Sequence, residues 1–449
     1  MKKAGSPWAY IPTLYLAEGL PYIIINAVSA VLYADLGYAD DQIAFWTGWL
    51  YLPWILKMFW SPLVDGKSTK RRWLLAAQSA LAAVFLGVAA LSAWSLFAAT
   101  AQTGGLTFFS LSLFGFLLGA FVSATLDIAT DGFYLLALNA QNQSRFVGIR
   151  TIFYRLAMIL GSGVLVWITG ALANPNPQLS LDVVPWPYNW TVLFGFLGLL
   201  FAAFVAYHAY TLPYPPQDGP AASSEKNAFK EAFKTYFTQQ NIVYVLLFIL
   251  LYRLGDAMLE KTVIPFLIKP ASQGALGISL AQYGLIKGTL GLGAVILGNL
   301  AGGWLLSRYG FKKCIWPFAA VLILPNFFYA YMAFFKPPLW QIASLITLEH
   351  LGNGLAMMAF MVFIMYVSQG KYKTSHYAIS TGIMALGMMG PSMLSGALEV
   401  RLGYGPFFLL TALLSLVTIL VVPLAFKIKS IEATEREFRR HKMSLEDAE

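Results

Sequence analysis

Long apolar runs, separated by short polar or Pro/Gly-containing breaks, dominate the hydrophobicity pattern of this chain. A helix that crosses a bilayer needs about 20 consecutive, mostly apolar residues. The pattern predicts about twelve such spans, at residues 9–33, 43–63, 73–98, 107–138, 146–172, 188–212, 241–268, 280–306, 314–335, 339–368, 375–399 and 405–427. We therefore expect an all-α polytopic membrane protein.

One polar interruption is much longer than the others and divides six predicted spans from six. Its first part is rich in Pro, Gly and Ser, and its second part spaces Phe229, Phe233 and Phe237 four residues apart beside Lys230 and Lys234. That second part is either an amphipathic helix on the membrane surface or a solvated helix. The expected organisation is an N-terminal half at 1–212, a linker at 213–240, a C-terminal half at 241–428 and a tail at 429–449.

Composition and charge placement agree with this interpretation. Of the 449 residues 58% are hydrophobic and only 11% are charged, against about 25% charged in soluble domains. With a cytoplasmic N-terminus, 21 of the 30 Lys and Arg residues fall in cytoplasmic segments and three fall on the opposite side, Lys269, Lys336 and Arg401. This positive-inside bias predicts that both termini are cytoplasmic. The net charge of +9 therefore reflects topology and gives no support to a nucleic-acid partner.

Carboxylates in the interior of the predicted spans are the most informative residues. A charge at the bilayer centre costs about 2.5–3.5 kcal/mol on insertion scales, so such groups usually face a cavity or pair with one another. All of them fall in the first, fourth, seventh and tenth spans: Glu18, Asp127, Asp131, Asp256, Glu260 and Glu349. We expect them to converge on a central cavity to which both halves contribute.

Asp127 and Asp131 stand four residues apart, which places both on one face of a helix. Like charges crowded in a partly desolvated site favour proton uptake by one of them. We predict proton-coupling roles for Asp127, Asp131, Asp256 and Glu349. The alternative is structural, with Arg150 and Arg155 neutralising the two aspartates without a part in transport.

Other polar residues of the spans are candidates for substrate binding. Glu18 precedes Pro21, which predicts a helix kink beside a carboxylate, and Arg253, Asp256 and Glu260 follow the three- and four-residue spacing of one helix face. The predicted substrate-binding set is Glu18, Lys57, Arg155, Arg253, Glu260 and Asn353. For the seventh span the alternative is charge pairing that only lowers the cost of insertion.

A weak repeat links the two halves. WSPLVDGKSTKRRW at residues 60–73 and GWLLSRYGFKKCIW at 303–316 each join a span end to a polar turn, a basic cluster and a Trp. This resembles the signature loop of the major facilitator superfamily, whose halves are related by such repeats. The resemblance implies a conformational latch on the cytoplasmic side, formed by Asp65, Arg71 and Arg72; the alternative is a topology determinant only.

A larger set of strings occurs in order along nearly the whole chain: GLPYIIINAVSAVLY, LKMFWSPLVDG, DIATDG, FYRLAMILGSG, LYRLGDA, KGTLGLGAVILGNLAGG and LEHLGNG. Together they resemble the bacterial muropeptide permease family, AmpG, and the related acetyl-CoA transporters, a branch of the major facilitator superfamily. The resemblance implies that fold and proton-driven import of anhydromuropeptides across the inner membrane for cell-wall recycling. Asp127, Asp131, Arg155, Asp256 and Glu349 fall on the family's charged motifs, whereas Glu260 and Lys261 depart from the permease pattern.

The leading hypothesis is thus a proton-coupled importer that works by alternating access in the bacterial inner membrane. Alternatives are import of a siderophore or CoA-like metabolite, export of a drug or metabolite, and, outside transport, an intramembrane enzyme or sensor. The sequence offers no nucleophile–base set and no cysteine-based metal motif, and its four histidines lie far apart. We expect no catalytic residues, no metal and no cofactor, with a small-molecule substrate, protons and the lipid bilayer as partners of a monomer.

Overall fold

The computed structural model describes residues 6–98, 104–138, 140–172, 188–216, 218, 226–368 and 373–428, and the regular structure within these ranges is helical throughout. Among these described residues, eleven stretches are long and apolar enough to cross a membrane: Pro7–Asp35, Lys70–Trp94, Phe108–Ala137, Gly148–Leu172, Asn189–Thr211, Ile242–Ile268, Leu280–Tyr309, Phe311–Phe335, Leu339–Val367, Ser375–Leu402 and Tyr404–Ala425. The predicted all-α polytopic fold is therefore confirmed.

The second predicted span, 43–63, is not among these eleven stretches. The segment is helical, as α3 (Asp40–Gly48), the 3-10 turn η3 (Trp49–Tyr51) and α4 (Leu52–Lys67). Its tryptophans, Pro53 and Lys57 lower its mean hydropathy. The segment is therefore helical but less apolar than the eleven candidate membrane spans.

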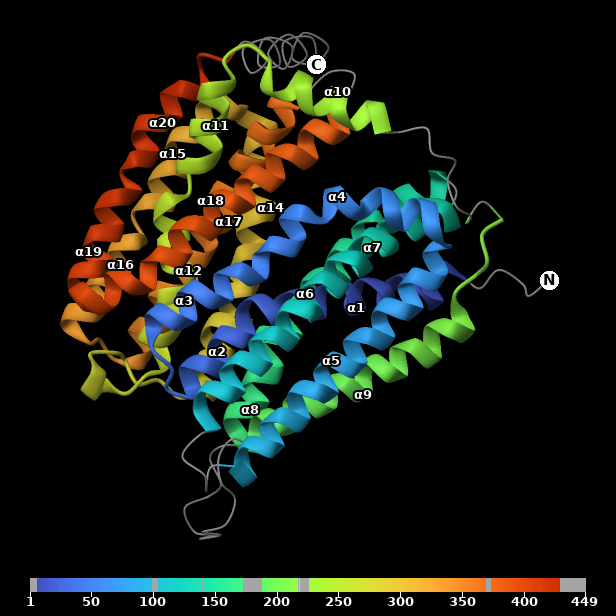
Figure 1. The fold of residues 1–449 in the computed structure, drawn as a ribbon. Coiled ribbons are helices and arrows are strands. Elements are labelled where there is room, and N and C mark those ends of the chain that lie inside the picture. The colour runs from blue at the N-terminus through green and yellow to red at the C-terminus, as the bar shows by residue number, and fades with distance from the viewer. Residues whose placement is uncertain are drawn as a thin grey trace. The chain divides into compact units, whose positions relative to one another are not determined.

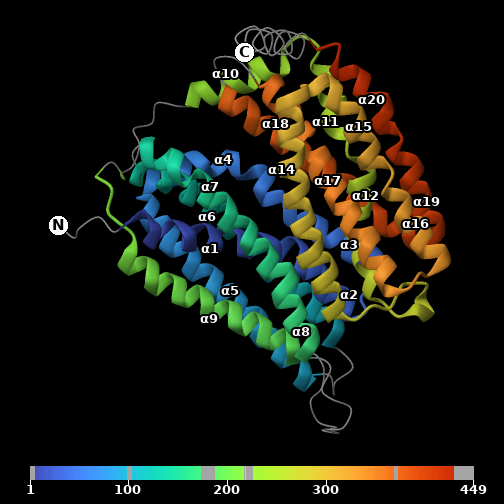
Figure 2. The ribbon, with the colours of Figure 1, turned by 180° about the vertical axis from the view of Figure 1, so that it is seen from behind.

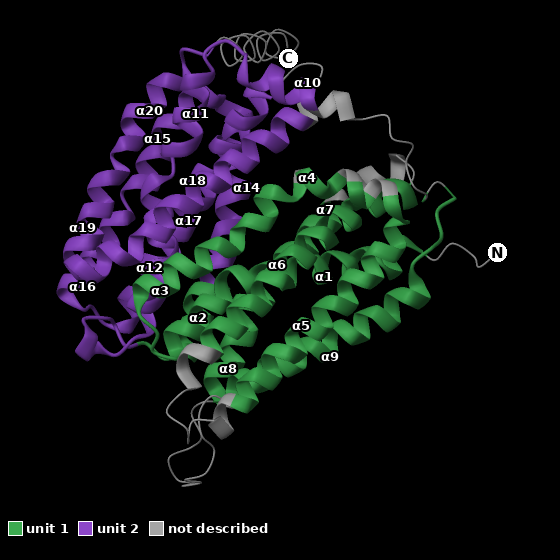
Figure 3. Ribbon diagram, viewed as in Figure 1, with its two compact units in different colours: residues 1–223, 278–289 green, residues 224–277, 290–449 purple. Residues whose placement is uncertain are grey.

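The helices group into two compact units, coloured separately in Figure 3. Unit 1 comprises residues 1–223 and 278–289, and unit 2 comprises 224–277 and 290–449. The start of the eighth predicted span thus packs with unit 1, although it follows the linker in sequence. The four-part division expected from the sequence stays a prediction.

Unit 1 is built around the long helices α5, α6 and α9. In it α5 packs along both α6 and α9, and α1 packs along α7; the pairing of α5 with α9 is visible in Figures 1 and 2. Besides α3 and α4, its helices are α1 Ile11–Ile23, α2 Ser29–Asp35, α5 Lys70–Ala98, α6 Gly104–Ala137, α7 Ala140–Ile159, α8 Val166–Leu172, α9 Tyr188–Thr211 and α13 Leu280–Tyr283, with η1 Pro7–Ala9, η2 Ile24–Val28, η4 Leu160–Leu165 and the first part of η6 Gly284–Gly291.

The first span is irregular where the sequence predicts a kink. Pro21 lies inside α1, and the chain continues after Ile23 as the π-helical segment η2. Because proline has no N–H to donate, the helical hydrogen-bond pattern is interrupted at this point. One turn earlier, a Cβ on Gly19 would come within 2.8 Å of the Tyr154 carbonyl oxygen of α7, so the glycine allows close packing of α1 on α7.

Glycines of the eighth span mediate close helix packing on two sides, as their small-xxx-small spacing predicts. Added Cβ atoms at Gly284 and Gly288 would meet the backbone of residues 162–167. Added Cβ atoms at Gly298 and Gly302 would meet the backbone of residues 351–355. The glycines of this span thus contact two different stretches of backbone, residues 162–167 and residues 351–355.

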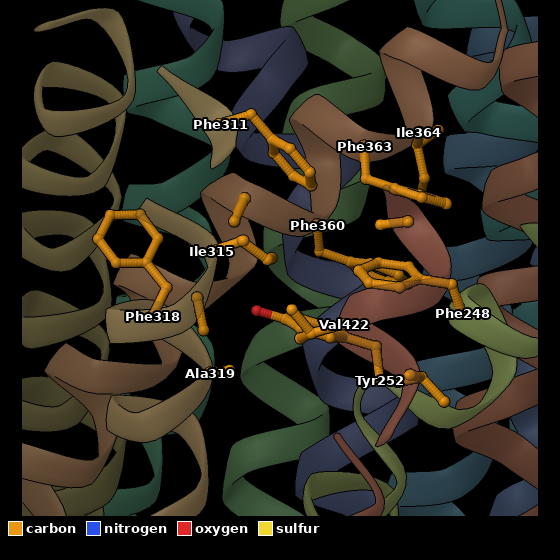
Figure 4. Packing of buried hydrophobic residues seen from close by; sticks show 14 of the residues in the cluster. Phe248, Tyr252, Phe311, Ile315, Phe318, Ala319, Phe360, Phe363, Ile364 and Val422 are labelled. Atoms are coloured by element: carbon orange, nitrogen blue, oxygen red, sulfur yellow. The ribbon is translucent and has the colours of Figure 1, made fainter. Parts of the chain in front are cut away.

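Unit 2 contains the remaining helices. They are α10 Lys226–Phe237, α11 Ile242–Leu251, α12 Leu254–Ile268, α14 Leu292–Tyr309, α15 Phe311–Ile323, α16 Asn326–Phe335, α17 Leu339–Val367, α18 Lys373–Leu402, α19 Tyr404–Ser415 and α20 Val417–Ala425, with the 3-10 turn η5 Ala271–Gln273. Its core contains stacked aromatic rings (Figure 4): Phe248 lies 3.9 Å from Phe363 and 4.8 Å from Tyr252, and Tyr252 lies 5.4 Å from Phe360, centroid to centroid. Such aromatic packing supports a rigid unit.

The seventh span is broken, contrary to the continuous helix expected over 241–268. Helix α11 ends at Leu251 and α12 begins at Leu254, with Arg253 in a non-helical conformation between them (φ −114°, ψ 26°). The hydroxyl of Thr418 donates a 2.8 Å hydrogen bond to the Tyr252 carbonyl oxygen at this break. A broken helix is tolerated at membrane depth where neighbouring side chains satisfy the freed backbone groups.

Helix α10, the amphipathic part of the linker, packs on α18. Ala232 and Tyr236 are buried, the hydroxyls of Tyr236 and Ser380 are 2.8 Å apart, and Thr235 Oγ1 lies 3.0 Å from His376 Nε2. Burial raises the pKa of Tyr236. Of the three phenylalanines singled out in the sequence, Phe233 is 40% exposed and Phe237 is 38% exposed, and the Phe229 side chain lies outside what the structure describes.

Candidate functional site

Lys57 and Asp127 form an ion pair inside unit 1. Lys57 stands on α4 and Asp127 on α6, and the ammonium group donates to Asp127 Oδ2. The lysine side chain is 38% exposed and the aspartate side chain 18%. A proton-coupling candidate and a substrate-binding candidate are therefore direct partners, which their separation of 70 residues did not indicate.

Asp131, one turn further along α6, belongs to a second charge cluster. Arg150 of α7 approaches its Oδ1 at 3.0 Å, and the hydroxyl of Tyr15 donates to the same oxygen at 2.9 Å. Arg150 also donates to the Tyr15 hydroxyl at 3.0 Å, and its guanidinium lies 5.0 Å from the centroid of the Tyr134 ring. Asp131 thus has the arginine partner that the structural alternative assigned to it.

Sequence reasoning missed Tyr15. It lies on α1 one helical turn before Glu18, and three-residue spacing on a helix places two side chains on the same face. That spacing was the available signal. Sequence reasoning also missed Tyr329 of α16, which lies 20 residues before Glu349 and donates to it.

Glu18 differs from the two aspartates of unit 1. Glu18 is 6% exposed, and its Oε2 atom has no hydrogen-bond partner within the described residues. Asp127, Asp131 and Lys57 are the charged side chains close enough to interact electrostatically with its carboxyl group. The aromatic residues Tyr22 and Trp54 pack edge to face nearby, 5.1 Å apart. Arg155, the remaining substrate-binding candidate of this unit, is half-buried on α7.

In unit 2, the helix break places Arg253 against Asp256 and Asn353. Arg253 Nε and Nη2 lie 3.2 and 3.1 Å from Asp256 Oδ2, and the Asn353 amide donates to the same oxygen at 3.0 Å. Arg253 Nη2 also donates to Asn353 Oδ1 at 3.1 Å. The three candidates therefore form one closed network, in which the aspartate charge is matched by a single arginine.

Glu349 forms a separate cluster on α17. The hydroxyl of Tyr329 donates to Glu349 Oε2 at 3.2 Å, and His350 Nδ1 lies 2.5 Å from that oxygen. His350 Nδ1 also lies 3.0 Å from the Ile346 carbonyl oxygen.

Glu260 is half-buried on α12, next to the fully buried Lys261. Among the described residues no group of three or more His, Cys, Asp or Glu side chains is arranged to hold a metal ion.

Of the predicted latch residues, Arg71 binds backbone at the end of α9. It donates to the carbonyl oxygens of Ala209 at 2.7 Å and Leu212 at 3.4 Å, and its guanidinium lies 4.0 Å from the Tyr214 ring centroid. Arg72 is exposed. The Asp65 side chain lies outside what the structure describes. Arg71 thus contacts the C-terminal end of α9, and the latch role of these residues stays a prediction.

An aspartate of the linker completes this contact, and sequence reasoning missed it. The carboxylate of Asp218 accepts from the backbone N–H groups of Lys70 at 2.6 Å and Arg71 at 3.1 Å. Both N–H groups belong to the first turn of α5, where backbone donors lack helical partners and a carboxylate is favourable. The first part of the linker is therefore attached to unit 1.

An apolar groove of about 630 Å³ lies elsewhere in unit 1, between α5 and α6, and is lined by Ala83, Val84, Gly87, Val88, Ala90, Leu91, Trp94, Gly115 and Leu118. None of these residues is ionisable. Because specific sites need a few converging polar groups, the charged clusters are better candidates than this groove.

The fold and the intramembrane charges can now be compared with known proteins. The profile of the Major Facilitator Superfamily matches residues 13–388 and 255–444. The chain belongs to the Major Facilitator Superfamily. The superfamily is a class of membrane transporters and not of enzymes, so this chain is a membrane transporter.

Within the superfamily the chain is similar to AmpG-type proteins. It is 24% identical over 363 residues to the anhydromuropeptide permease of Escherichia coli, which covers 79% of this chain and 67% of that protein. It is 24% identical over 421 residues to a Rickettsia conorii protein named transporter AmpG 4, which covers 91% and 94%. An uncharacterized protein of Haemophilus influenzae is 24% identical over 412 residues, covering 87% and 88%. The resemblance to this branch of the superfamily is confirmed.

Solved structures of the superfamily confirm the fold. The nucleoside transporter NupG has a TM-score of 0.67 at 15% identity, covering 94% of this chain and 98% of that one. A D-xylose-proton symporter has a TM-score of 0.66 at 12% identity, covering 92% and 96%. At such low identity these likenesses concern the fold alone.

Proposed function

We propose that this transporter imports anhydromuropeptides across the bacterial inner membrane, driven by protons and working by alternating access. The AmpG-named relatives, which align over most of the chain, support the substrate class. The superfamily fold supports the transport mode, because such transporters rock one half against the other around a central site. Siderophores and CoA-like metabolites are the alternative substrates.

The observation that carries the proposal is the presence of paired charges in the apolar spans of both units. Lys57–Asp127 and Arg150–Asp131 pair in unit 1, and Arg253–Asp256 in unit 2. Removing two charges from water costs more than their attraction returns unless the geometry is favourable. Intramembrane ionisable groups are accordingly hypotheses for substrate or proton sites.

The predicted roles are retained as part of this proposal. The proton-coupling candidates are Asp127, Asp131, Asp256 and Glu349, and the substrate-binding candidates are Glu18, Lys57, Arg155, Arg253, Glu260 and Asn353. Lys57 is a suitable contact for a carboxylate of a glycopeptide, because 38% of its side chain is exposed. Arg253 is 15% exposed and hydrogen-bonded on two sides, so a substrate carboxylate would have to displace Asp256 or Asn353.

The topology belongs to the same proposal. The excess of Lys and Arg in alternate segments supports cytoplasmic termini. Arg71, with Asp65 and Arg72, would then form the cytoplasmic latch, and the protein would act as a monomer. Single-cysteine accessibility in intact cells tests this orientation, since Cys314 is buried and the only native cysteine.

Uptake into proteoliposomes tests the function. Purified full-length protein, reconstituted with an imposed inward proton gradient, should accumulate labelled anhydromuropeptide, and collapse of the gradient by an ionophore should abolish accumulation. Siderophores and CoA esters serve as parallel substrates. Accumulation of one of these in place of anhydromuropeptide would overturn the substrate, and gradient-independent equilibration would overturn the proton coupling.

A further inference from the structure

Among the described interior carboxylates of the first and fourth spans, Glu18 has no cation as a dedicated ion-pair partner. Asp127 forms an ion pair with Lys57 and Asp131 with Arg150, whereas Glu18 forms no ion pair in the part of the chain that the structure describes. Two cations, Lys57 and Arg150, thus neutralise two of the three carboxylates, and Glu18 is the third. If all three were ionised, this region would hold an uncompensated negative charge.

Burial makes that charge costly at Glu18 in particular. The residue is 6% exposed and its Oε2 atom is buried without a hydrogen-bond partner among the described residues. An isolated ionised carboxylate in an apolar environment usually neutralises, because the neutral acid avoids most of the desolvation cost. Nearby carboxylates add to this preference, since like charges that share a site cannot all ionise.

The surroundings of Glu18 are well defined. Its own helix α1 supplies the Tyr15 hydroxyl, α4 supplies Lys57, and α6 supplies Asp127 and Asp131. From α7, the Arg150 guanidinium and the Tyr154 hydroxyl also face it. From α9, His208 contacts α1: its imidazole lies 3.0 Å from the Thr13 hydroxyl of α1 and 2.9 Å from the Gln78 side chain.

The turn of α1 that carries Glu18 is closely packed against its neighbours. Gly19, the next residue, brings α1 against the α7 backbone at Tyr154. Tyr22, one turn further along α1, packs against Trp54 at 5.1 Å and Tyr154 at 6.5 Å. Pro21 lies within the same turn of α1.

We propose that Glu18 is the residue that carries the transported proton, and that the Lys57–Asp127 pair responds to its loss. This inference rests on the proposed proton coupling and assigns it to a residue that the sequence placed in the substrate set. In the described state the proton resides on the Glu18 carboxyl group and Lys57 is bound by Asp127. When the proton leaves to solvent, the Glu18 carboxylate competes with Asp127 for the Lys57 ammonium group.

The first test is transport by the full-length Glu18→Gln protein in proteoliposomes. Glutamine retains the shape of the protonated acid but cannot release a proton. With one proton per substrate, a gradient of one pH unit supports about tenfold accumulation, and the variant should fall to equal concentrations on both sides. Exchange of substrate between the two sides should continue, because it requires no net proton movement.

Glu399→Gln is the matched control. Glu399 is a buried carboxylate of α18, 6% exposed, and it is not among the predicted site residues. This variant should accumulate substrate like the natural protein. If Glu18→Gln still accumulates substrate on a proton gradient, the inference fails. It also fails if the variant only raises KM with coupling intact, which would make Glu18 a substrate contact.

A second measurement does not depend on substrate. Infrared difference spectra of the reconstituted protein, recorded as the pH is raised, should show the loss of a protonated-carboxyl band. That band should be absent in Glu18→Gln and present in Glu399→Gln. If the natural protein transports no anhydromuropeptide, the proposed substrate fails while this band still tests the proton on Glu18. If the band persists in Glu18→Gln, another residue holds the proton.

Glu18→Asp addresses the case in which the glutamine variant does not fold. Aspartate keeps a titratable carboxyl group on a shorter side chain. We expect proton-driven accumulation to be retained with a shifted pH midpoint. Loss of coupling in a folded Glu18→Asp protein with an unchanged infrared band would contradict the assignment.

Discussion

Replacing Asp256 by leucine should destabilise unit 2 through the arginine that it leaves behind. The Asp256 carboxylate accepts from Arg253 Nε and Nη2 and from the Asn353 amide at 3.0–3.2 Å. Its side chain is 8% exposed and that of Arg253 is 15% exposed. The substitution therefore removes the only carboxylate that pairs with this buried guanidinium in the described structure.

The expected loss follows from the contacts that remain. Breaking a buried pair by removing one partner costs about 3–5 kcal/mol. Arg253 would keep its bonds to Asn353 Oδ1 at 3.1 Å and Met357 Sδ at 3.4 Å, so we expect a value of about 3 kcal/mol. The double variant Arg253→Met, Asp256→Leu should cost less than Asp256→Leu alone, because replacing both charges by apolar groups leaves no unpaired ion.

A double-mutant cycle in mixed micelles measures this coupling. Equilibrium unfolding of the full chain, followed by tryptophan fluorescence, gives the free energy of unfolding for the natural protein, each single variant and the double variant. Asn353→Ala provides a scale for the neutral partner, with an expected loss of about 1–3 kcal/mol. The reasoning is refuted if the single Asp256 variant costs less than the double variant, or if the losses of the two single variants simply add.

Three further substitutions test packing and capping. Asp218→Ala should cost about 0.5–2 kcal/mol and speed hydrogen exchange of the first α5 amides, because two N–H groups lose their acceptor; unchanged exchange would contradict this. Gly298→Ala should lower the melting temperature, since its Cβ would overlap the Leu351 carbonyl oxygen, whereas Gly293→Ala meets nothing within 4 Å and should not. Tyr236→Phe should lose about 0.5–1.5 kcal/mol and loosen α10 in hydrogen exchange, unless the 2.8 Å hydroxyl contact with Ser380 is unimportant.

Periodicity and hydropathy were sufficient for the architecture because they report an average over many side chains. The apolar runs predicted the helices. The second span shows the limit of this approach: aromatic residues and Lys57 reduce its hydropathy although the segment is helical. The break at Arg253 was invisible in the sequence, because it depends on a hydroxyl supplied by Thr418, 166 residues away.

The charged residues could be selected from the sequence, but their partners could not. Helical spacing determines which residues share a face of one helix; it carries no information about which helix lies opposite. Arg150 could be named as an alternative partner of Asp131 because it lies on the next predicted span. Lys57 with Asp127 and Asn353 with Asp256 required the tertiary structure.

Charged residues stand beside a helix irregularity in the first span of each half. Glu18 precedes Pro21 and the π-helical segment η2 in the first span, and Arg253 occupies the break between α11 and α12 in the seventh. In transporters of repeated architecture, discontinuous helices supply binding sites because their backbone groups are not committed to a regular helix. At such points a change in side-chain charge can alter local backbone geometry with little loss of helical hydrogen bonding. Titration of Glu18, or displacement of Arg253 from Asp256, would therefore act beside a helix irregularity in each unit.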